Sequence, residues 1–192
     1  MSEIINVILL IISAIIFILP AYVANGSALV FGGGTPLDMG KTLKDGRRLI
    51  GDGVTWKGFI GGVIAGTIMG AILGLIGQFT GITINQFSFG AINTVVYGDI
   101  LSGLILGFLL AFGALCGDAI GSFIKRRIGI QRGKSAPIMD QLDFVIVALI
   151  FSILVVHFNN IWFILLICVL TLIIHLGTNA GAYLLGLKDV WY

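Results

Sequence analysis

Five long apolar runs constrain the fold of this chain more than any other feature of its sequence. A membrane-spanning helix needs about 20 mainly apolar residues, whereas a membrane β-strand needs about 10 residues that alternate apolar with polar side chains. The runs are far longer than such strands and do not alternate. The sequence therefore predicts an all-α polytopic membrane protein, a bundle of about five transmembrane helices. The expected helices are Ile4–Phe31, Gly58–Phe79, Ile100–Ile124, Leu142–Phe158 and Ile161–Leu187.

The composition excludes the main classes of soluble protein. Hydrophobic residues make up 58% of the 192 residues, charged residues only 10%, and the mean hydropathy is +1.11. Soluble domains carry about 25% charged residues. The same composition excludes intrinsic disorder, a disulfide scaffold and a nucleic-acid-binding module. We expect one integral-membrane domain over residues 1–192, with the lipid bilayer as a partner and no nucleic acid.

The cations of the chain are confined to three segments. Five of the 11 Lys and Arg residues lie between Lys41 and Lys57, five lie between Lys125 and Lys134, and the last is Lys188. Because Lys and Arg hold loops on the cytoplasmic side, we expect cytoplasmic loops at about 32–57 and 123–141, the N-terminus outside and the C-terminus inside. A cleaved signal peptide is disfavoured for the first helix, because its start carries Glu3 and no cation.

Glycines recur at four-residue spacing in the second and third expected helices. They are Gly58, Gly62, Gly66, Gly70 and Gly74 in the second, and Gly103, Gly107, Gly113, Gly117 and Gly121 in the third. This spacing keeps small residues on nearly one helical face, where a second backbone can approach closely. Packing within the bundle is the favoured interpretation, and a homodimer face is the alternative.

Three carboxylates at one expected membrane edge are candidates for a metal site. Asp118 lies near the inner end of the third helix, and Asp140 and Asp143 are spaced to share a face at the start of the fourth. Mg²⁺ prefers one or two carboxylates together with water and phosphate oxygens. The cluster therefore predicts a magnesium ion bound with a polyphosphate. In the alternative, Asp140 and Asp143 only favour a helix start, and Asp118 only pairs with an Arg.

The loop at 32–57 has the composition of a phosphate-binding segment. It opens with three consecutive glycines, and it mixes Asp with the cations Lys44, Arg47, Arg48 and Lys57. Glycine lets backbone amides approach phosphate, and Lys and Arg neutralise it. No Walker motif is present. The alternative is a cationic topology signal that touches anionic headgroups, which would leave the Asp and Gly residues of the loop unexplained.

Two separate motifs resemble those of CDP-diacylglycerol synthases. Residues 55–62 read TWKGFIGG, similar to the TWEGFIGG stretch of that family. Gly117, Asp118, Ser122, Lys125 and Arg126 resemble part of its signature, and residues 140–143, DQLD, resemble its closing D-R-x-D. Lys57 and Gln141 depart from this pattern, and the family's G-H-G-G segment is missing before Asp140. With only five spans and with PAYVANG at 20–26 leading into GTPLD at 34–38, the chain is more similar to the archaeal CDP-archaeol synthases.

This resemblance implies a magnesium-dependent cytidylyltransferase in the cell membrane, with its active site on the cytoplasmic side. The implied reaction joins CTP to an isoprenoid ether-lipid phosphate, 2,3-bis-O-(geranylgeranyl)-sn-glycerol 1-phosphate, and releases pyrophosphate. Asp118, Lys125 and Arg126 are the expected catalytic residues, and Asp118, Asp140 and Asp143 the expected metal ligands. The expected nucleotide or phosphate contacts are Asn25, Thr35, Asp38, Lys44, Arg47, Arg48, Asp52, Thr55 and Lys57, of which Asn25, Thr35, Asp38 and Asp52 would meet cytosine or ribose. A glycine-walled groove between the second and third helices is a hypothetical path for the isoprenoid chains.

Other classes of membrane protein fit the sequence less well. A small transporter would place polar residues at mid-membrane and show inverted repeats, but the carboxylates cluster at one edge. A CDP-alcohol phosphotransferase would show Asp-Gly-x-x-Ala-Arg, which the region around Asp118 does not. The chemistry alone leaves a diacylglycerol-phosphate substrate open. His175, Thr171, Thr178 and Asn179 are expected to make interhelical hydrogen bonds rather than to bind metal.

Overall fold

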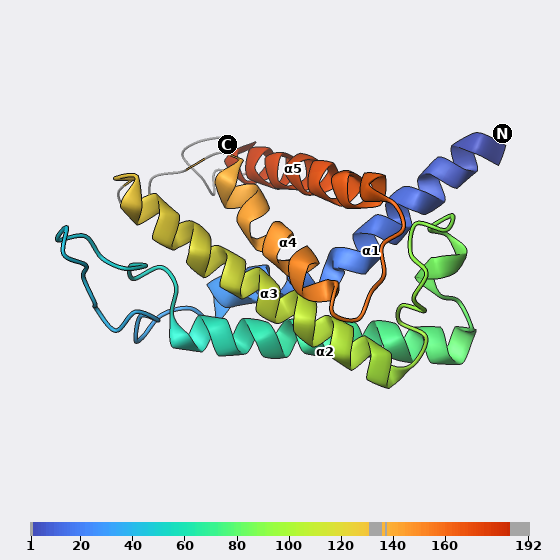
Figure 1. Ribbon diagram of the computed structural model, residues 1–192, viewed down its shortest axis with the longest axis horizontal. Coiled ribbons are helices and arrows are strands. Elements are labelled where there is room, and N and C mark those ends of the chain that lie inside the picture. The colour runs from blue at the N-terminus through green and yellow to red at the C-terminus, as the bar shows by residue number, and fades with distance from the viewer. Residues whose placement is uncertain (1, 131–135, 137, 185–192) are drawn as a thin grey trace.

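The computed structural model describes residues 2–130, 136 and 138–184. Within them the chain folds into five α-helices and one short 3-10 helix (Figure 1). The elements are α1 (Ser2–Val30), α2 (Trp56–Thr80), η1 (Ile84–Gln86), α3 (Ile100–Arg127), α4 (Met139–Ser152) and α5 (Ile161–Leu184). The predicted all-helical class and the five helices are confirmed. The cations Arg132, Lys134 and Lys188 lie outside the described residues.

Four of the five described helices are long and apolar enough to cross a bilayer, namely α1, α2, α3 and α5. Helix α4 has 14 residues and rises about 21 Å, less than the roughly 30 Å of a hydrocarbon core. The predicted fourth span is therefore too long, because residues 153–158 are not helical.

Residues 153–156 turn back onto the carbonyls at the end of α4, and residues 157–159 then bond to the loop before α3. The N–H of Asn159 donates to the carbonyl of Ala91 (2.9 Å), and the N–H of Asn93 donates to the carbonyl of His157 (3.1 Å). The Asn93 and Asn159 side chains are also joined, at 2.9 Å. Backbone groups at membrane depth must be paired, and here tertiary contacts pair them.

The glycine ladder of α2 brings three helices into backbone contact. A Cβ atom built on Gly62 would lie 2.6 Å from the carbonyl oxygen of Ala24 in α1, and one on Gly70 would lie 2.5 Å from the Cα atom of Gly107 in α3. The glycines thus serve packing within the bundle, as predicted, and they are buried. No lipid path fits between α2 and α3 here, so the hypothetical groove at that place is wrong. A homodimer stays a prediction, but the glycine face of α2 is buried within the bundle and does not support it.

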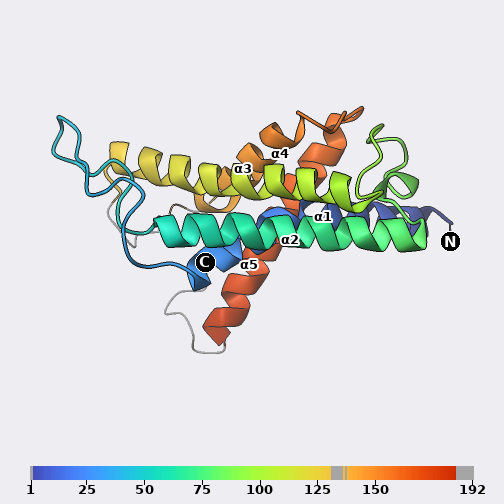
Figure 2. The same ribbon diagram turned by 90° about the horizontal axis from the view of Figure 1, so that it is seen from below.

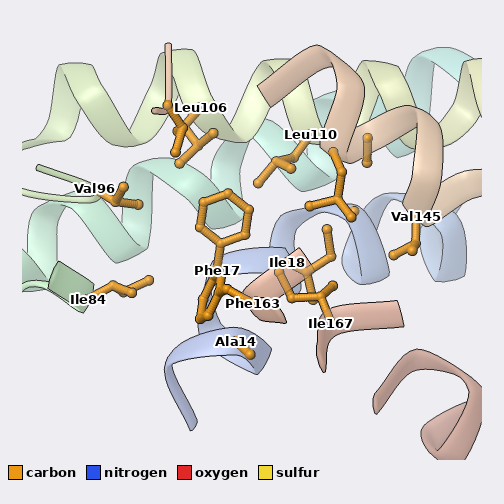
Figure 3. Close-up of a cluster of buried hydrophobic side chains, with 14 of the residues drawn as sticks. Ala14, Phe17, Ile18, Ile84, Val96, Leu106, Leu110, Val145, Phe163 and Ile167 are labelled. Atoms are coloured by element: carbon orange, nitrogen blue, oxygen red, sulfur yellow. The ribbon is translucent and has the colours of Figure 1, made fainter. Parts of the chain in front are cut away.

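Helix α1 lies in the middle of the bundle and contacts the other four α-helices. Its Phe17 and Ile18 are buried against Leu110 of α3, Val145 of α4 and Ile167 of α5 (Figure 3). The core is therefore centred on α1.

Polar side chains add a few hydrogen bonds to this packing. The hydroxyls of Tyr22 in α1 and Thr171 in α5 are 2.8 Å apart, which confirms the interhelical bond predicted for Thr171. Thr178, in contrast, donates to the carbonyl of His175 within its own helix (3.0 Å).

The loop from 31 to 55 and the last turns of α3 lie at the same end of the molecule (Figures 1 and 2). We refer to this loop, the last two turns of α3 and the first turn of α4 as the charged end. Residues 81–99 connect α2 to α3 at the opposite end. The arrangement matches the predicted separation of the cationic loops from those without Lys or Arg.

Candidate functional site

The loop at the charged end is folded around the buried carboxylate of Asp38. This carboxylate accepts hydrogen bonds from the backbone N–H groups of Gly40, Ile50 and Gly51 (2.9–3.0 Å) and pairs with Arg48 at 2.7 Å. Burial raises the pKa of Asp38, but these hydrogen bonds outweigh it and hold the pKa well below its ordinary value. Asp38 therefore organises the loop, and its oxygens are engaged before any nucleotide arrives.

Two antiparallel backbone pairings give the loop its shape. Pro36 pairs with Thr55, and Thr42 pairs with Arg48. The side chain of Arg48 also reaches Asp52, at 2.8 Å. Arg48 and Asp52, both expected to contact nucleotide, thus belong to the internal framework of the loop.

Helix α2 begins at this loop with a capped N-terminus. The Thr55 hydroxyl accepts a hydrogen bond from the N–H of Gly58 (3.2 Å), as a cap residue should. The side chain of Lys57 lies against Gly34 of the triple glycine, with a distance of 3.6 Å from its Cδ to a Cβ built there. Thr55 and Lys57 are therefore held where α1, the loop and α2 meet.

A small pocket of about 30 Å³ opens between α1, α2, α3 and the loop. Asn25, Thr55 and Asp118 line it together with Gly53 and Phe59. Asp118 makes no side-chain hydrogen bond within the part of the chain that the structure describes, so its carboxylate is available to a ligand. The fold thus brings together three residues that are 30 and 63 positions apart in the sequence.

Asp140 is engaged by a lysine that the sequence placed in the same site. Lys125 Nζ lies 2.8 Å from Asp140, and the N–H of Ala136 donates to the same carboxylate at 2.9 Å. Of the three expected metal ligands, Asp140 is therefore the one already neutralised by a protein cation.

Asp143 projects from α4 into space that Gly121 of α3 leaves free. A Cβ atom on Gly121 would lie 2.8 Å from the Asp143 Cγ atom, and one on Gly117 would lie 2.7 Å from the Cα of Phe144. One carboxylate oxygen of Asp143 accepts from the N–H of Phe144 (2.7 Å). The other is buried without a hydrogen-bond partner among the described residues. A buried, unpaired carboxylate oxygen is costly unless a cation meets it.

The three carboxylates suit a magnesium ion shared with phosphate better than an all-protein cage. Asp118, Asp140 and Asp143 are close enough to repel one another. In the described ranges, however, no group of three acidic, His or Cys residues has the geometry to hold a metal on its own. Asp118 and Asp143 have unengaged oxygens, which matches the one or two carboxylates that Mg²⁺ takes when phosphate supplies other ligands.

An apolar groove of about 500 Å³ lies between α3 and α4, and Asp143 is among its lining residues. Ile120, Ile124, Leu142, Ile146 and Val147 form its walls, and Gly117 and Gly121 form its floor. A hydrocarbon chain in the membrane could lie along it with a polar head at the carboxylate. This groove lies between α3 and α4, whereas the groove suggested by the sequence would lie between α2 and α3.

The remaining expected contacts are spread over the charged end. Arg126 donates to the carbonyl of Ile130 (2.8 Å), and its Nε atom is buried and unpaired in the described part of the chain. Thr35 is exposed, and its carbonyl accepts from the N–H of Trp56 (3.1 Å). Lys44 is exposed near the turn of the loop. Of these three, only Arg126 lies beneath the loop, next to Gly51.

The sequence did not predict roles for Asp45 and Arg127, which link the loop to α3. Arg127 pairs with Asp45 at 2.6 Å, and Arg47 donates to the carbonyl of Arg127 at 2.7 Å. Arg127 follows Lys125 and Arg126 directly, but the family motif ends at Arg126. No local pattern marks Asp45, because its partner is 82 residues away.

The fold and the site together define an intramembrane protein whose carboxylates and cations meet at one end of a helical bundle, between a polar pocket and a lipid-facing groove. A family model described as "CarS-like: CDP-archaeol synthase" matches residues 4–192. The CDP-archaeol synthase of Methanocaldococcus jannaschii is 50% identical over 95% of this chain and 98% of its own length. That of Methanothermobacter thermautotrophicus is 53% identical over 100% and 99%. The chain belongs to the CDP-archaeol synthase family.

A solved structure supports the same assignment. It is described as an intramembrane enzyme for archaeal membrane lipids biosynthesis. It is 37% identical in sequence, with a TM-score of 0.71 over 88% of this chain and 94% of its own.

Proposed function

We propose that this protein transfers CMP from CTP to 2,3-bis-O-(geranylgeranyl)-sn-glycerol 1-phosphate and releases pyrophosphate. Beyond family membership, one observation supports this reaction most directly. Asp118 lines a polar pocket and Asp143 lines an apolar groove, and these two carboxylates are close enough to repel each other. A nucleotide and a lipid phosphate can therefore meet at one charged centre.

The reaction would be an in-line displacement at the α-phosphorus of CTP. An oxygen of the lipid phosphate attacks, the bond to the β-phosphate oxygen breaks, and pyrophosphate leaves. Positioning and charge neutralisation supply most of the catalysis in such transfers. Asn25 and Thr55 would contact part of the nucleotide, because a pocket of about 30 Å³ is too small to contain CTP whole. Lys125 and Arg126 would neutralise the pyrophosphate, for which Lys125 only has to turn from its partner Asp140.

Asp118 and Asp143 would hold the magnesium ion, and Asp140 would pair with Lys125 until Lys125 turns to the pyrophosphate. When bound, magnesium neutralises charge that develops on the phosphates and orients the triphosphate. The buried, unpaired oxygen of Asp143 supports this assignment, because the protein offers it no hydrogen bond within the described residues.

The groove between α3 and α4 would take the isoprenoid chains. Its walls are Ile, Leu and Val side chains, and Asp143 stands where the lipid phosphate would meet the metal. Lys125 follows Gly121 by four residues, about one turn of α3, so it can also meet the negative charge of the lipid phosphate.

The direct test supplies purified protein with labelled CTP, MgCl₂ and the isoprenoid ether-lipid phosphate. We expect labelled CDP-lipid and an equal amount of pyrophosphate. A parallel reaction with a diacylglycerol phosphate measures whether ester lipids also serve. If neither acceptor gives a CDP-lipid, the proposed function is wrong; if only the ester lipid reacts, the lipid assignment is wrong.

A further inference from the structure

The tip of the loop is fastened to the end of α3 by two arginines that point in opposite directions. From the loop, Arg47 donates to the carbonyls of Arg126 (3.3 Å) and Arg127 (2.7 Å). From α3, Arg127 pairs with Asp45 at 2.6 Å and donates to the carbonyl of Arg48. We refer to Asp45, Arg47 and Arg127 as the latch.

Arg47 stabilises the end of α3, and Arg127 stabilises the tip of the loop. The last carbonyls of a helix have no partner within the helix, and a cation there is favourable. The Arg47 guanidinium supplies the end of α3 with both a hydrogen-bond donor and a positive charge. The guanidinium of Arg127 also lies over the Phe123 ring, 5.4 Å from its centroid. The N–H of Arg47 and then the Arg127 guanidinium lower the pKa of Asp45, so Asp45 is ionised at neutral pH.

The latch controls a short stretch of chain that ends at the polar pocket. Directly after Arg47, Arg48 binds Asp38 and Asp52. Gly51 then lies against Arg126, and Gly53 to Thr55 form part of the pocket wall beside Asp118. Only eight residues, 48–55, separate the latch from the start of α2. The latch is therefore connected to the wall of the pocket through a short, hydrogen-bonded stretch of chain.

The apolar groove lies on the other side of the carboxylates. Its lining comes from α3, α4 and Ile138, and none of it comes from the loop. Opening the latch would therefore change access to the polar pocket while leaving the groove as it is.

We propose that Asp45, Arg47 and Arg127 are positioning residues that hold the loop closed over bound CTP, and that CTP enters and pyrophosphate leaves by release of this latch. This inference rests on the proposed function. The lipid reaches the carboxylates through the groove and does not pass the latch. Arg47, which the sequence suggested as a phosphate contact, then acts through α3 rather than on the nucleotide.

Charge reversal tests the latch on the full-length protein in lipid nanodiscs. Asp45→Arg and Arg127→Asp each place like charges opposite each other, and the double variant restores an attractive pair. We expect each single variant to raise the KM for CTP about threefold to tenfold, with the KM for the lipid within about twofold of wild type. The double variant should recover most of the loss. Lys41→Glu, a charge reversal at an exposed neighbour in the same loop, should leave both KM values unchanged.

Limited trypsin digestion supplies a measurement that is independent of turnover. Without CTP, cleavage within the loop should be several times faster in Arg127→Asp than in wild type. The isosteric variant Asp45→Asn should show the same direction of change and covers the case in which a reversal variant fails to fold. Melting temperatures in the nanodisc should stay close to wild type, because the latch lies outside the helical core.

Three results would overturn the latch: unchanged KM for CTP in both single variants, a double variant no better than the worse single one, or a lipid KM that rises as much as that for CTP. Failure of the proposed function is a separate outcome. In that case wild type makes no CDP-lipid, but the faster digestion of Arg127→Asp and Asp45→Asn is still expected.

Discussion

Single glycines decide where the carboxylates of this protein can stand. Gly121 leaves room for the Asp143 side chain, and Gly117 lets the backbone of α4 approach α3. Asp118 lies between these two glycines in sequence. Gly117 and Gly121, which have no side chains, thus allow these carboxylates to come together.

Adding one methyl group at Gly121 should therefore damage the site. In Gly121→Ala the new Cβ would lie 2.8 Å from the Asp143 Cγ atom, so the carboxylate has to move. We expect at least a tenfold loss of turnover, as for other small misplacements of catalytic groups. Steady-state assays measure it. Gly177→Ala is the matched control, because a Cβ there meets nothing within 4 Å, and it should keep normal turnover.

Neutralising either unengaged carboxylate should remove magnesium-dependent activity. We expect Asp118→Asn and Asp143→Asn to lose turnover by at least 100-fold, because a metal ligand and a negative charge are both lost. Magnesium titration of activity, with melting curves to verify folding, is the measurement. Asp99→Asn at the opposite end of α3 is the control, since Asn also caps helices. Near-normal activity of Asp118→Asn would remove Asp118 from the metal site.

Sequence reasoning located these residues but could not assign all their partners. It placed Asp118, Asp140 and Asp143 at one depth, and they do interact electrostatically. It could not show that Asp38 and Arg48 bind each other. A charged residue in a basic loop can pair with a phosphate or with its own loop, and the difference depends on contacts between residues distant in the sequence.

At the scale of the elements, the loop from 31 to 55 depends on one carboxylate. In Asp38→Asn the shape of the side chain is kept, but the negative charge that binds Arg48 and three N–H groups is lost. Hydrogen bonds to a charged group contribute about 1.5–3 kcal/mol. We expect the loop to lose at least about 2 kcal/mol of local stability, seen as faster hydrogen exchange at Ile50 and Gly51. Unchanged exchange there would contradict this role.

The low pKa of Asp38 also sets the pH range over which the loop stays folded. A carboxyl group with a folded-state pKa below its unfolded value stabilises the fold above the unfolded pKa, and this stability is lost as pH falls through the folded one. The ordinary value is 3.8, and Asp38 lies well below it. Exchange at Ile50 and Gly51 should therefore be independent of Asp38 titration from pH 5 to 8. A change that tracks protonation of Asp38 in that range would contradict the assignment.

The packing of α2 against α3 leaves no tolerance for side chains. In Gly70→Val the added atoms would meet the backbone of Gly103 and Gly107, which cannot rotate away. Overpacking of this kind costs about 1–3 kcal/mol. We expect a lower melting temperature in detergent than for Gly181→Val, where a Cβ meets nothing within 4 Å. Equal melting temperatures would show that the two helices can separate without cost.

Helix boundaries show where local sequence is sufficient and where it is not. The ends of α1, α2 and α3 fall within three residues of the expected ones, because apolar runs end there at Gly, Thr or Arg. The end of α4 could not be predicted, since Ile153 to Val156 continue the apolar run. Their N–H groups turn back onto the carbonyls of residues 150–152, and the chain then pairs with Ala91 and Asn93 through Asn159 and His157.

For the whole molecule, the orientation in the membrane stays a prediction from the cations. In a variant without Cys116 and Cys168, single cysteines are placed at Lys41, in the loop of the charged end, and at Asn160, whose neighbour Asn159 bonds to Ala91 in the connection at the opposite end. A membrane-impermeant thiol reagent applied to whole cells should label Asn160→Cys and not Lys41→Cys. Labelling of Lys41→Cys alone would reverse the orientation.

The groove between α3 and α4 has a consequence for how a membrane grows. Its described lining comes from the last turns of α3 and from residues 138–147, so in a bundle that spans the bilayer it would lie in the half next to the charged end. Under the proposed reaction, the acceptor lipid is drawn from that leaflet and the activated product is returned to it. The opposite leaflet then receives none of this product directly, and lipids made from it must be carried across by a separate protein.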